Sequence, residues 1–387
     1  MKKYIVIAAT IMTMSMASYA QAATSNSSAD LEQVGTANKG TIEQEDSNFS
    51  SAEIEQFGNV NTAEIEQTGN DNQADVEQTG DANNADVEQA GNNNSAEVDQ
   101  TGDNNFVDVD QNGNGNSVEL VQKGNDNSAE VEQSGNGNSA EVEQQGNANS
   151  VELSQNGDNN NADVEQIGNN NNAEVSQTGI SNTVDVDQNG DSNVAEVDQS
   201  GTANFAEVEQ TGTSNRAEVE QSGISNIANV EQNGMGNNAD VEQNGTGNDA
   251  TVEQAGLSNM ADVDQSGSNN VAEIEQDGSN NEAEIEQVGM GNDADIEQSG
   301  DSNFAELAQN GDFNVADIDQ SGSFNSAELE QMGNNNLAEI EQSGSNNLAD
   351  VEQTGSFNTA SVEQVGSFNA ADVDQTGLNN VAKVVQK

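Results

Sequence analysis

Closely spaced pairs of carboxylates are the residues of this sequence best suited to chemistry. Glu97 and Asp99 are separated by one residue, and similar pairs recur in nearly every eleven-residue stretch of the chain. Such a pair in a pocket can act as general acid and general base. Repetition in nearly every stretch is instead typical of a solvated face, and the sequence has no histidine or cysteine to build a nucleophile–base pair. We therefore expect no enzymatic activity, no cofactor and no specific metal site.

Two ligand-binding motifs are suggested by the composition and then disfavoured by spacing. The aspartate- and glycine-rich sequence resembles calcium-binding nonapeptide solenoids, but their period is nine residues and here it is eleven. Weak calcium binding to the acidic face stays open. Fragments such as Gly113–Gly115 lack the strand–loop–helix context of a phosphate-binding loop.

The overall charge excludes one class of partner. Seventy acidic residues stand against seven basic ones, which gives a formal charge of −63. Neutralising phosphates requires lysine and arginine, so no nucleic-acid partner is expected. Composition alone is also typical of a disordered acidic polymer. A strict repeat argues against disorder, because a solvated polymer needs no invariant spacing.

That repeat is eleven residues long. From Gln56 to Gln386 a glutamine stands at every eleventh position, a glycine follows two residues after each glutamine but the last, and an asparagine follows after five. The period therefore determines the architecture. The first five repeats contain the ladder residues Gln56, Gln67, Gln78, Gln89, Gln100, Asn61, Asn72, Asn83, Asn94 and Asn105, and the turn glycines Gly58, Gly69, Gly80, Gly91 and Gly102.

An eleven-residue period fits either a hendecad helix or a strand with a turn. Ala96, Val98 and Gln100 alternate with Glu97 and Asp99, which is the period of a strand. A helix would also have to accept a glycine in every repeat, at about 1 kcal/mol each. The sequence therefore predicts strands of five or six residues with the apolar residues and glutamine facing inward.

Because one unit cannot close a coil, two units would form each 22-residue coil with two facing strands. The predicted fold is all-β: a parallel two-sheet β-solenoid with a cross-β core and about fifteen coils. Glutamines would stack on glutamines and asparagines on asparagines, so that their amides form hydrogen-bonded ladders along the axis. Carboxylates would also stack at about 4.8 Å and repel each other by about 0.9 kcal/mol per pair in water. Low pH, salt or calcium should then favour assembly.

The chain divides into three segments by sequence. Residues 1–22 have a basic start, an apolar run too short to span a bilayer and an Ala-x-Ala site, which together predict a secretory signal peptide. Residues 23–50 are a degenerate lead-in, interpreted as a cap or an export-targeting segment. Residues 51–387 are the regular repeats.

The repeat resembles the curlin repeat of the curli major subunit. The motif residues are Asn72, Gln78, Asn83 and Gln89, with Gly80 and Ala85 between them. The resemblance implies a secreted functional amyloid that polymerises with itself into extracellular fibres of a bacterial biofilm matrix. It also implies a nucleator subunit, a periplasmic chaperone and an outer-membrane export pore as partners. Asparagine replaces the family's serine at the repeat start, and the family's glycine-rich targeting segment is not recognisable in residues 23–50.

Two further points stay open at the level of sequence. The alternative function is a non-polymerising acidic β-solenoid, such as an adhesin stalk or a calcium-dependent surface protein. The last strand replaces both acidic positions with Lys383 and Val385, which lowers repulsion for a docking copy. If stacking continues at the strand that contains Ala52, Lys383 would lie near Glu64 of the neighbouring copy.

Overall fold

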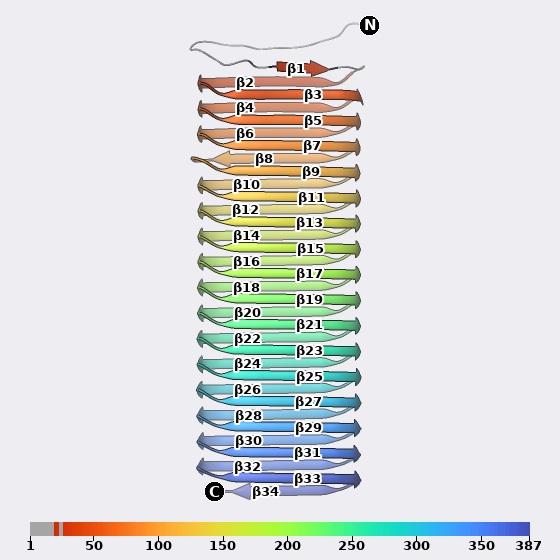
Figure 1. Cartoon of the computed structure of the whole chain (residues 1–387), viewed down its shortest axis with the longest axis vertical. Coiled ribbons are helices and arrows are strands. Elements are labelled where there is room, and N and C mark those ends of the chain that lie inside the picture. The colour runs from red at the N-terminus through yellow and green to blue at the C-terminus, as the bar shows by residue number, and fades with distance from the viewer. Residues whose placement is uncertain (1–18, 23–25) are drawn as a thin grey trace. The chain divides into compact units, whose positions relative to one another are not determined.

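The computed structural model describes residues 19–22 and 26–387, which form β-strands joined by short arcs (Figure 1). The chain divides into two compact units, residues 1–192 and 193–387. The described residues include no helix, and hence none long and apolar enough to cross a membrane. The expected signal peptide lies outside the described residues except for its last four, which form a strand.

The strands of the first unit alternate between two parallel sheets, odd-numbered strands in one and even-numbered strands in the other. Their bounds are β1 (Tyr19–Ala22), β2 (Ser28–Thr36), β3 (Lys39–Asn48), β4 (Ser51–Asn59), β5 (Thr62–Asn70), β6 (Gln73–Asp81), β7 (Asn84–Asn92), β8 (Ser95–Thr101), β9 (Phe106–Asn114), β10 (Ser117–Asn125), β11 (Ser128–Asn136), β12 (Ser139–Asn147), β13 (Ser150–Asp158), β14 (Asn161–Asn169), β15 (Asn172–Ile180) and β16 (Thr183–Asp191).

The second unit repeats the same alternation. Its strands are β17 (Val194–Thr202), β18 (Phe205–Thr213), β19 (Arg216–Ile224), β20 (Ile227–Met235), β21 (Asn238–Thr246), β22 (Asp249–Leu257), β23 (Met260–Ser268), β24 (Val271–Ser279), β25 (Glu282–Met290), β26 (Asp293–Asp301), β27 (Phe304–Asp312), β28 (Val315–Ser323), β29 (Ser326–Asn334), β30 (Leu337–Ser345), β31 (Leu348–Ser356), β32 (Thr359–Ser367), β33 (Ala370–Leu378) and β34 (Val381–Gln386).

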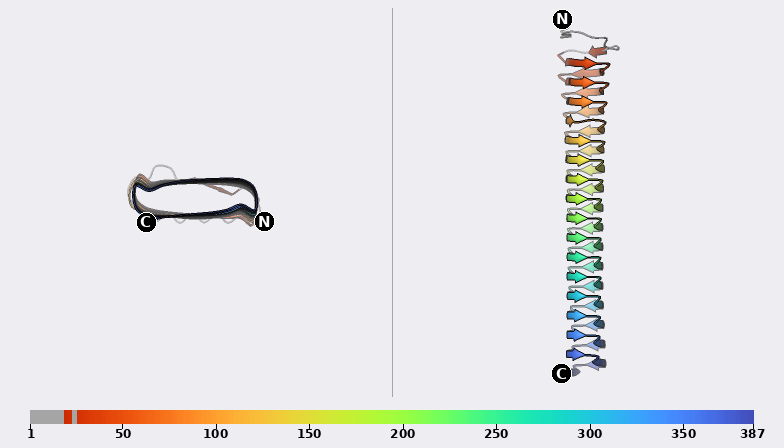
Figure 2. Two further views of the ribbon diagram at one scale, coloured as in Figure 1. Left: turned by 90° about the horizontal axis from the view of Figure 1, so that it is seen from below. Right: turned by 90° about the vertical axis from the view of Figure 1, so that its left-hand side faces the viewer.

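Parallel pairing in register links each strand to the strand one coil further on. Ala74 lies opposite Ala96 and Gln78 opposite Gln100, an offset of 22 residues. Within each unit, the end-on view shows two nearly flat layers joined by arcs (Figure 2). The predicted fold, a parallel two-sheet β-solenoid of eleven-residue strand–arc units, is confirmed. Most strands are longer than expected, at 9 residues, because the glycine and its neighbours continue the pairing.

The core is a single thin layer between the two sheets of each unit. Ala96, Val98 and Gln100 are each at most 1% exposed, whereas Glu97 on the opposite face of the strand is exposed. This alternation follows from the pleat of a strand, in which successive side chains point to opposite faces. Burial of the valine contributes roughly 1.5–3 kcal/mol per strand. Most strands thus add one alanine, one branched and one amide side chain to the core, and a few carry valine in place of the alanine, as Val107 does in β9.

The lead-in belongs to the solenoid, although its repeat is irregular in sequence. β2 pairs with β4 and β3 with β5 at an offset of 23 residues, and the register shifts between Glu45 and Asn48. Ser50, 1% exposed, accepts a hydrogen bond from the backbone N–H of Asn72 at 3.2 Å. A serine therefore stands where other coils have an asparagine, and the one-residue insertion is absorbed as a bulge. The boundary at residue 51 is a boundary of sequence regularity and not of the fold.

Candidate functional site

The glutamines of the repeat form two columns in the first unit, one in each sheet. Nε2 of Gln56 donates to Oε1 of Gln78 at 2.8 Å, and Gln78 donates in the same way to Gln100 at 2.8 Å. Gln67 donates to Gln89 at 2.9 Å in the other sheet. The ladder residues predicted from the sequence are all at most 2% exposed: Gln56, Gln67, Gln78, Gln89, Gln100, Asn61, Asn72, Asn83, Asn94 and Asn105.

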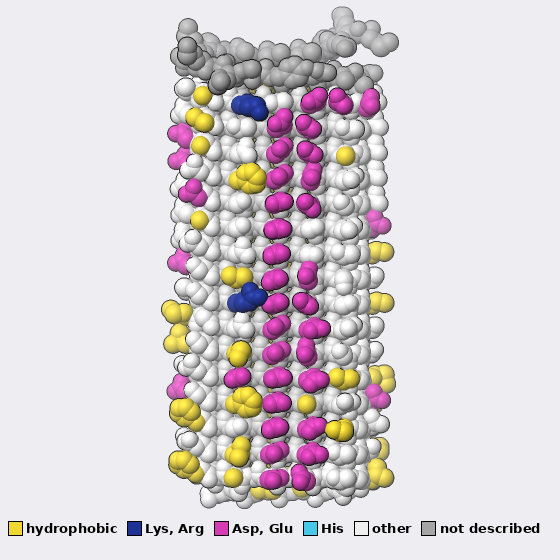
Figure 3. All heavy atoms as spheres, in the orientation of Figure 1, with side chains coloured by type: hydrophobic (Ala, Val, Ile, Leu, Met, Phe, Trp, Pro, Cys, Tyr) yellow, Lys and Arg dark blue, Asp and Glu magenta, His cyan; other side chains and the backbone are white. Residues whose placement is uncertain are grey.

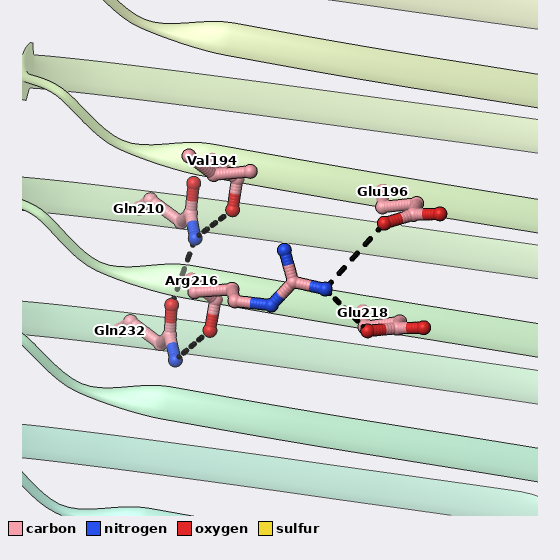
Figure 4. Close-up of polar contacts among 6 residues, drawn as sticks. All are labelled: Val194, Glu196, Gln210, Arg216, Glu218 and Gln232. Atoms are coloured by element: carbon pink, nitrogen blue, oxygen red, sulfur yellow. Dashed lines mark hydrogen bonds and ion pairs between the residues drawn. The ribbon is translucent and has the colours of Figure 1, made fainter.

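Each glutamine also uses its second amide hydrogen, which sequence reasoning did not foresee. Gln210 donates to Gln232 at 2.8 Å along the axis and to the backbone carbonyl of Val194 at 2.9 Å (Figure 4). The carbonyl belongs to the first residue of a strand in the facing sheet. The glutamine therefore joins successive coils and also holds the two sheets together beside the arc. Both amide hydrogens are satisfied, as burial requires.

The asparagines stack, but mainly through the backbone and not through amide–amide bonds as the sequence suggested. The backbone N–H of Asn83 donates to Oδ1 of Asn61 at 3.0 Å. Nδ2 of Asn83 donates to the carbonyl of Gly102 in the next coil at 2.8 Å. Direct amide–amide bonds occur at some rungs, for example from Asn325 to Asn303 at 3.2 Å. The asparagine thus fixes the arc of the adjoining coil.

The turn glycines are required because their backbones approach the next coil closely. A Cβ added to Gly80, at φ +125°, would lie 1.9 Å from the carbonyl oxygen of Gly102. That oxygen is the acceptor for the amide of Asn83. The other predicted turn glycines have the same geometry, with a Cβ-to-carbonyl distance of 1.8–1.9 Å: Gly58, Gly69, Gly91 and Gly102. The glycine of one coil therefore leaves room for a carbonyl of the next coil, and the asparagine donates a hydrogen bond to that same carbonyl.

A second backbone requirement falls on the residue four after each glutamine. Ala82 has φ 60° there, and Gly115 has φ 69°. In the second unit the same position holds bulky residues, including Phe324 at φ 57° and Phe368 at φ 58°, with 62% and 80% of their surfaces exposed. A left-handed conformation is unfavourable for such side chains. Asparagine, aspartate or glycine, which tolerate this conformation, occupies the position in many coils, but the residue type is not constant along the chain.

The strand register stacks carboxylates in two parallel columns on the outer face of each sheet, and Figure 3 shows the columns on one of these faces. Asp86 lies between Glu64 and Asp108 in its column, and one of its carboxylate oxygens is buried without a hydrogen-bond partner. Burial first, and then repulsion by Asp108 and Glu64, raise the pKa of Asp86 to about 6. The pKa values of further aspartates rise to about 6 for the same reasons: Asp163, Asp240, Asp262 and Asp295.

The few basic residues lie against these columns. Arg216 contacts both Glu196, at 3.5 Å, and Glu218 (Figure 4). Lys123 bonds Glu143 at 2.7 Å. These pairs are partly exposed, and such surface pairs contribute about 0–1 kcal/mol. The columns therefore keep nearly all of their repulsion.

The acidic face of the described residues has open hollows. One open hollow of about 350 Å³ is lined by Glu66, Glu88, Asp110 and Glu132 together with the neighbouring column of small polar residues. Within the described part of the chain, no group of three or more carboxylates has the geometry of a metal site. The hollow and the carboxylate columns are open and polar, whereas a small-molecule site usually has apolar walls and a few polar groups that point to one place.

The surroundings of Glu64 bear on its expected contact with Lys383 of a neighbouring copy. Glu64 lies on β5, which is paired with β3 on one side and β7 on the other. Within the same chain, Lys39 approaches Glu64 to 3.9 Å. Because the lead-in strand β3 pairs with β5, contact between Lys383 and Glu64 of a second copy would require β3 to leave that edge. The contact therefore stays a prediction.

Comparison with protein families places this geometry in a known group. No curated protein matches the chain. The model of the curlin associated repeat matches overlapping segments from residue 24 to residue 387: 24–58, 48–80, 69–102, 80–113, 102–135, 113–146, 146–179, 181–212, 201–234, 225–256, 234–267, 256–289, 267–300, 300–333, 325–355, 333–366 and 358–387. The first match includes β2 and β3, in agreement with the folded lead-in. The chain therefore belongs to the family of proteins built from curlin associated repeats.

Proposed function

We propose that this protein is a secreted structural subunit that assembles with itself into extracellular, curli-like amyloid fibres of the biofilm matrix. The observation that carries the proposal is the unbroken column of buried amides, such as Gln56, Gln78 and Gln100. Every rung offers a donor on one side and an acceptor on the other. A further strand with the same residues can therefore extend the column, whether it comes from the same chain or from another copy.

Family membership supports the route to the cell surface. Residues 1–22 would be removed as a signal peptide, so that the processed chain starts at Ala23. Residues 23–50 would act as a cap or an export-targeting segment, and they contain β2 and β3. A nucleator subunit, a periplasmic chaperone and an outer-membrane pore are the partners expected of such a fibre subunit. Its role would be structural, in adhesion and surface colonisation, with no catalytic step.

Incubation of the purified processed chain tests the proposal. We expect thioflavin T fluorescence to rise with time, particles to grow into fibres, and X-ray diffraction to show a reflection near 4.7 Å along the fibre axis. A chain that keeps β-rich circular dichroism, stays at monomer size and gives no thioflavin T signal would refute fibre formation. That outcome would favour an adhesin stalk or a calcium-dependent surface protein.

A further inference from the structure

One buried rung of the glutamine columns is incomplete. Gln44 on β3 is 0% exposed, and its Nε2 donates to Gln67 at 2.8 Å and to the carbonyl of Ser28 at 3.1 Å. Its Oε1 is buried and has no hydrogen-bond partner among the described residues. In the coils that follow, the same oxygen accepts from the glutamine one coil earlier. The oxygen of Gln44 therefore faces the position of the preceding strand.

That position is occupied by β1. Parallel pairing sets Tyr19 opposite Thr41 and Ala22 opposite Gln44. An alanine carries no amide, so β1 covers the edge of β3 without completing the rung. It is also short, at 4 residues, where a repeat strand pairs over nine. β1 is thus an imperfect substitute for a repeat strand.

The outward-facing charges of β3 are arranged differently from those of a regular strand. Regular strands such as β6 carry two carboxylates outward, Asp75 and Glu77. In β3 the first of these positions is Thr41 and only the second, Glu43, is acidic, while Lys39 begins the strand. Glu45 and Asp46 follow Gln44 and are exposed. An incoming strand would therefore meet an ammonium group at the start of β3 and carboxylates on both sides of Gln44.

We propose that β1 guards the edge of β3, and that its removal opens this edge to a repeat strand of a second copy of this chain. The incoming strand would place its glutamine over Gln44, so that its Nε2 donates to the unpaired Oε1. β34 has the required form. Among the described strands it pairs only with β32, and it carries Lys383 where regular strands carry an acid. The inference rests on the proposed fibre function and adds that the unprocessed chain accepts a partner at β3 more slowly than the processed chain.

Elongation of sonicated fibres of the processed chain tests the proposed role of β1. The full chain, residues 1–387, should add to these seeds several-fold more slowly than the processed chain that starts at Ala23. In the full chain, Ala20→Pro should recover much of the rate, because proline removes a backbone donor and disrupts pairing of β1 with β3. Equal elongation rates for the full and processed chains would refute the proposed role of β1.

The rung is tested in the processed chain. Gln44→Met should slow elongation several-fold, because the acceptor for the incoming amide is lost. Gln89→Met is the matched control: it removes the same two donated bonds from an interior rung and leaves the edge unchanged. If both variants elongate equally, the role of Gln44 is refuted. Failure of the processed chain to form any fibres would refute the proposed function instead, so the two outcomes are distinguishable.

Discussion

Asp86→Asn should stabilise the folded protein at neutral pH and not in acid. Burial and the neighbouring carboxylates raise the pKa of Asp86 from 3.8 to about 6, so the ionised side chain is disfavoured in the folded state. A difference of this size corresponds to ~3 kcal/mol without screening. Asp86 is only half-buried, and solvent screening reduces the expected effect to about 1 kcal/mol.

The sign of the pH dependence follows from the direction of the shift. Below pH 3.8 the carboxyl of Asp86 is protonated in both the folded and the unfolded state, and its favourable contribution is complete. As the pH rises through about 6, folded Asp86 must ionise and this contribution is lost. The neutral asparagine avoids the loss. The gain from Asp86→Asn should therefore be about 1 kcal/mol at pH 7.5 and close to zero at pH 3.5.

Urea unfolding of the freshly prepared monomer, followed by circular dichroism, measures this difference. Urea is preferable to guanidinium chloride, whose ions would screen the columns. Glu77→Gln is the control, because it removes a carboxylate from an exposed position of a column. The reasoning fails if Asp86→Asn has the same effect at both pH values, or if Glu77→Gln stabilises the protein as much.

Three further substitutions test the contacts of the repeat, each by urea unfolding. Gln111→Leu leaves the neighbouring rungs unpaired and should cost about 2–5 kcal/mol, and a loss below 1 kcal/mol would contradict a role for the ladder. Gly102→Ala should cost more than Gly115→Ala, because the added methyl would lie 1.8 Å from a carbonyl oxygen at Gly102 but has no neighbour within 4 Å at Gly115; equal losses would refute the close approach. Phe324→Asn should stabilise by about 1 kcal/mol, because asparagine tolerates its φ of 57° better, and a destabilised variant would show that the ring makes compensating contacts.

Sequence spacing was sufficient to predict the fold. The alternation of Ala96, Val98 and Gln100 with carboxylates identifies the strand, and the period sets the offset of 22 residues between paired strands. Register is strongly determined, because a slip of one residue would turn every carboxylate inward. The inward position of the glutamines followed from the same alternation. These features depend only on the period, which the sequence displays directly.

Other features depend on distances between coils, which a period does not reveal. The carbonyl of Gly102 accepts from Asn83, which also donates to the carbonyl of Thr79, so the asparagine serves the next coil as well as its own turn. The left-handed residue, Ala82 in that arc, is often asparagine, aspartate or glycine in other coils but has no constant type, so the sequence period does not identify it. The irregular segment around Ser50 was interpreted as a lead-in, because a bulge can absorb an insertion without any sequence period. The contact expected between Lys383 and Glu64 of a second copy was conditional on stacking at the strand that contains Ala52, and it stays a prediction.

Repulsion between carboxylates and hydrogen bonding between amides oppose each other in every coil. Their balance explains why pH can affect assembly of the protein differently from stability of the fold. Two carboxylate columns on each sheet give four like-charged contacts per coil at about 4.8 Å, worth roughly 2 kcal/mol after screening at physiological salt. The glutamine and asparagine side chains of a coil donate hydrogen bonds worth about 1 kcal/mol each, and several form in every coil. Inside a chain the amides therefore outweigh the repulsion. A docking copy meets the same repulsion and also loses translational and rotational freedom. The net free energy of its addition is therefore closer to zero than that of adding a coil within one chain. Protonation of carboxylates such as Asp86 should consequently shift assembly more than it shifts the stability of the fold.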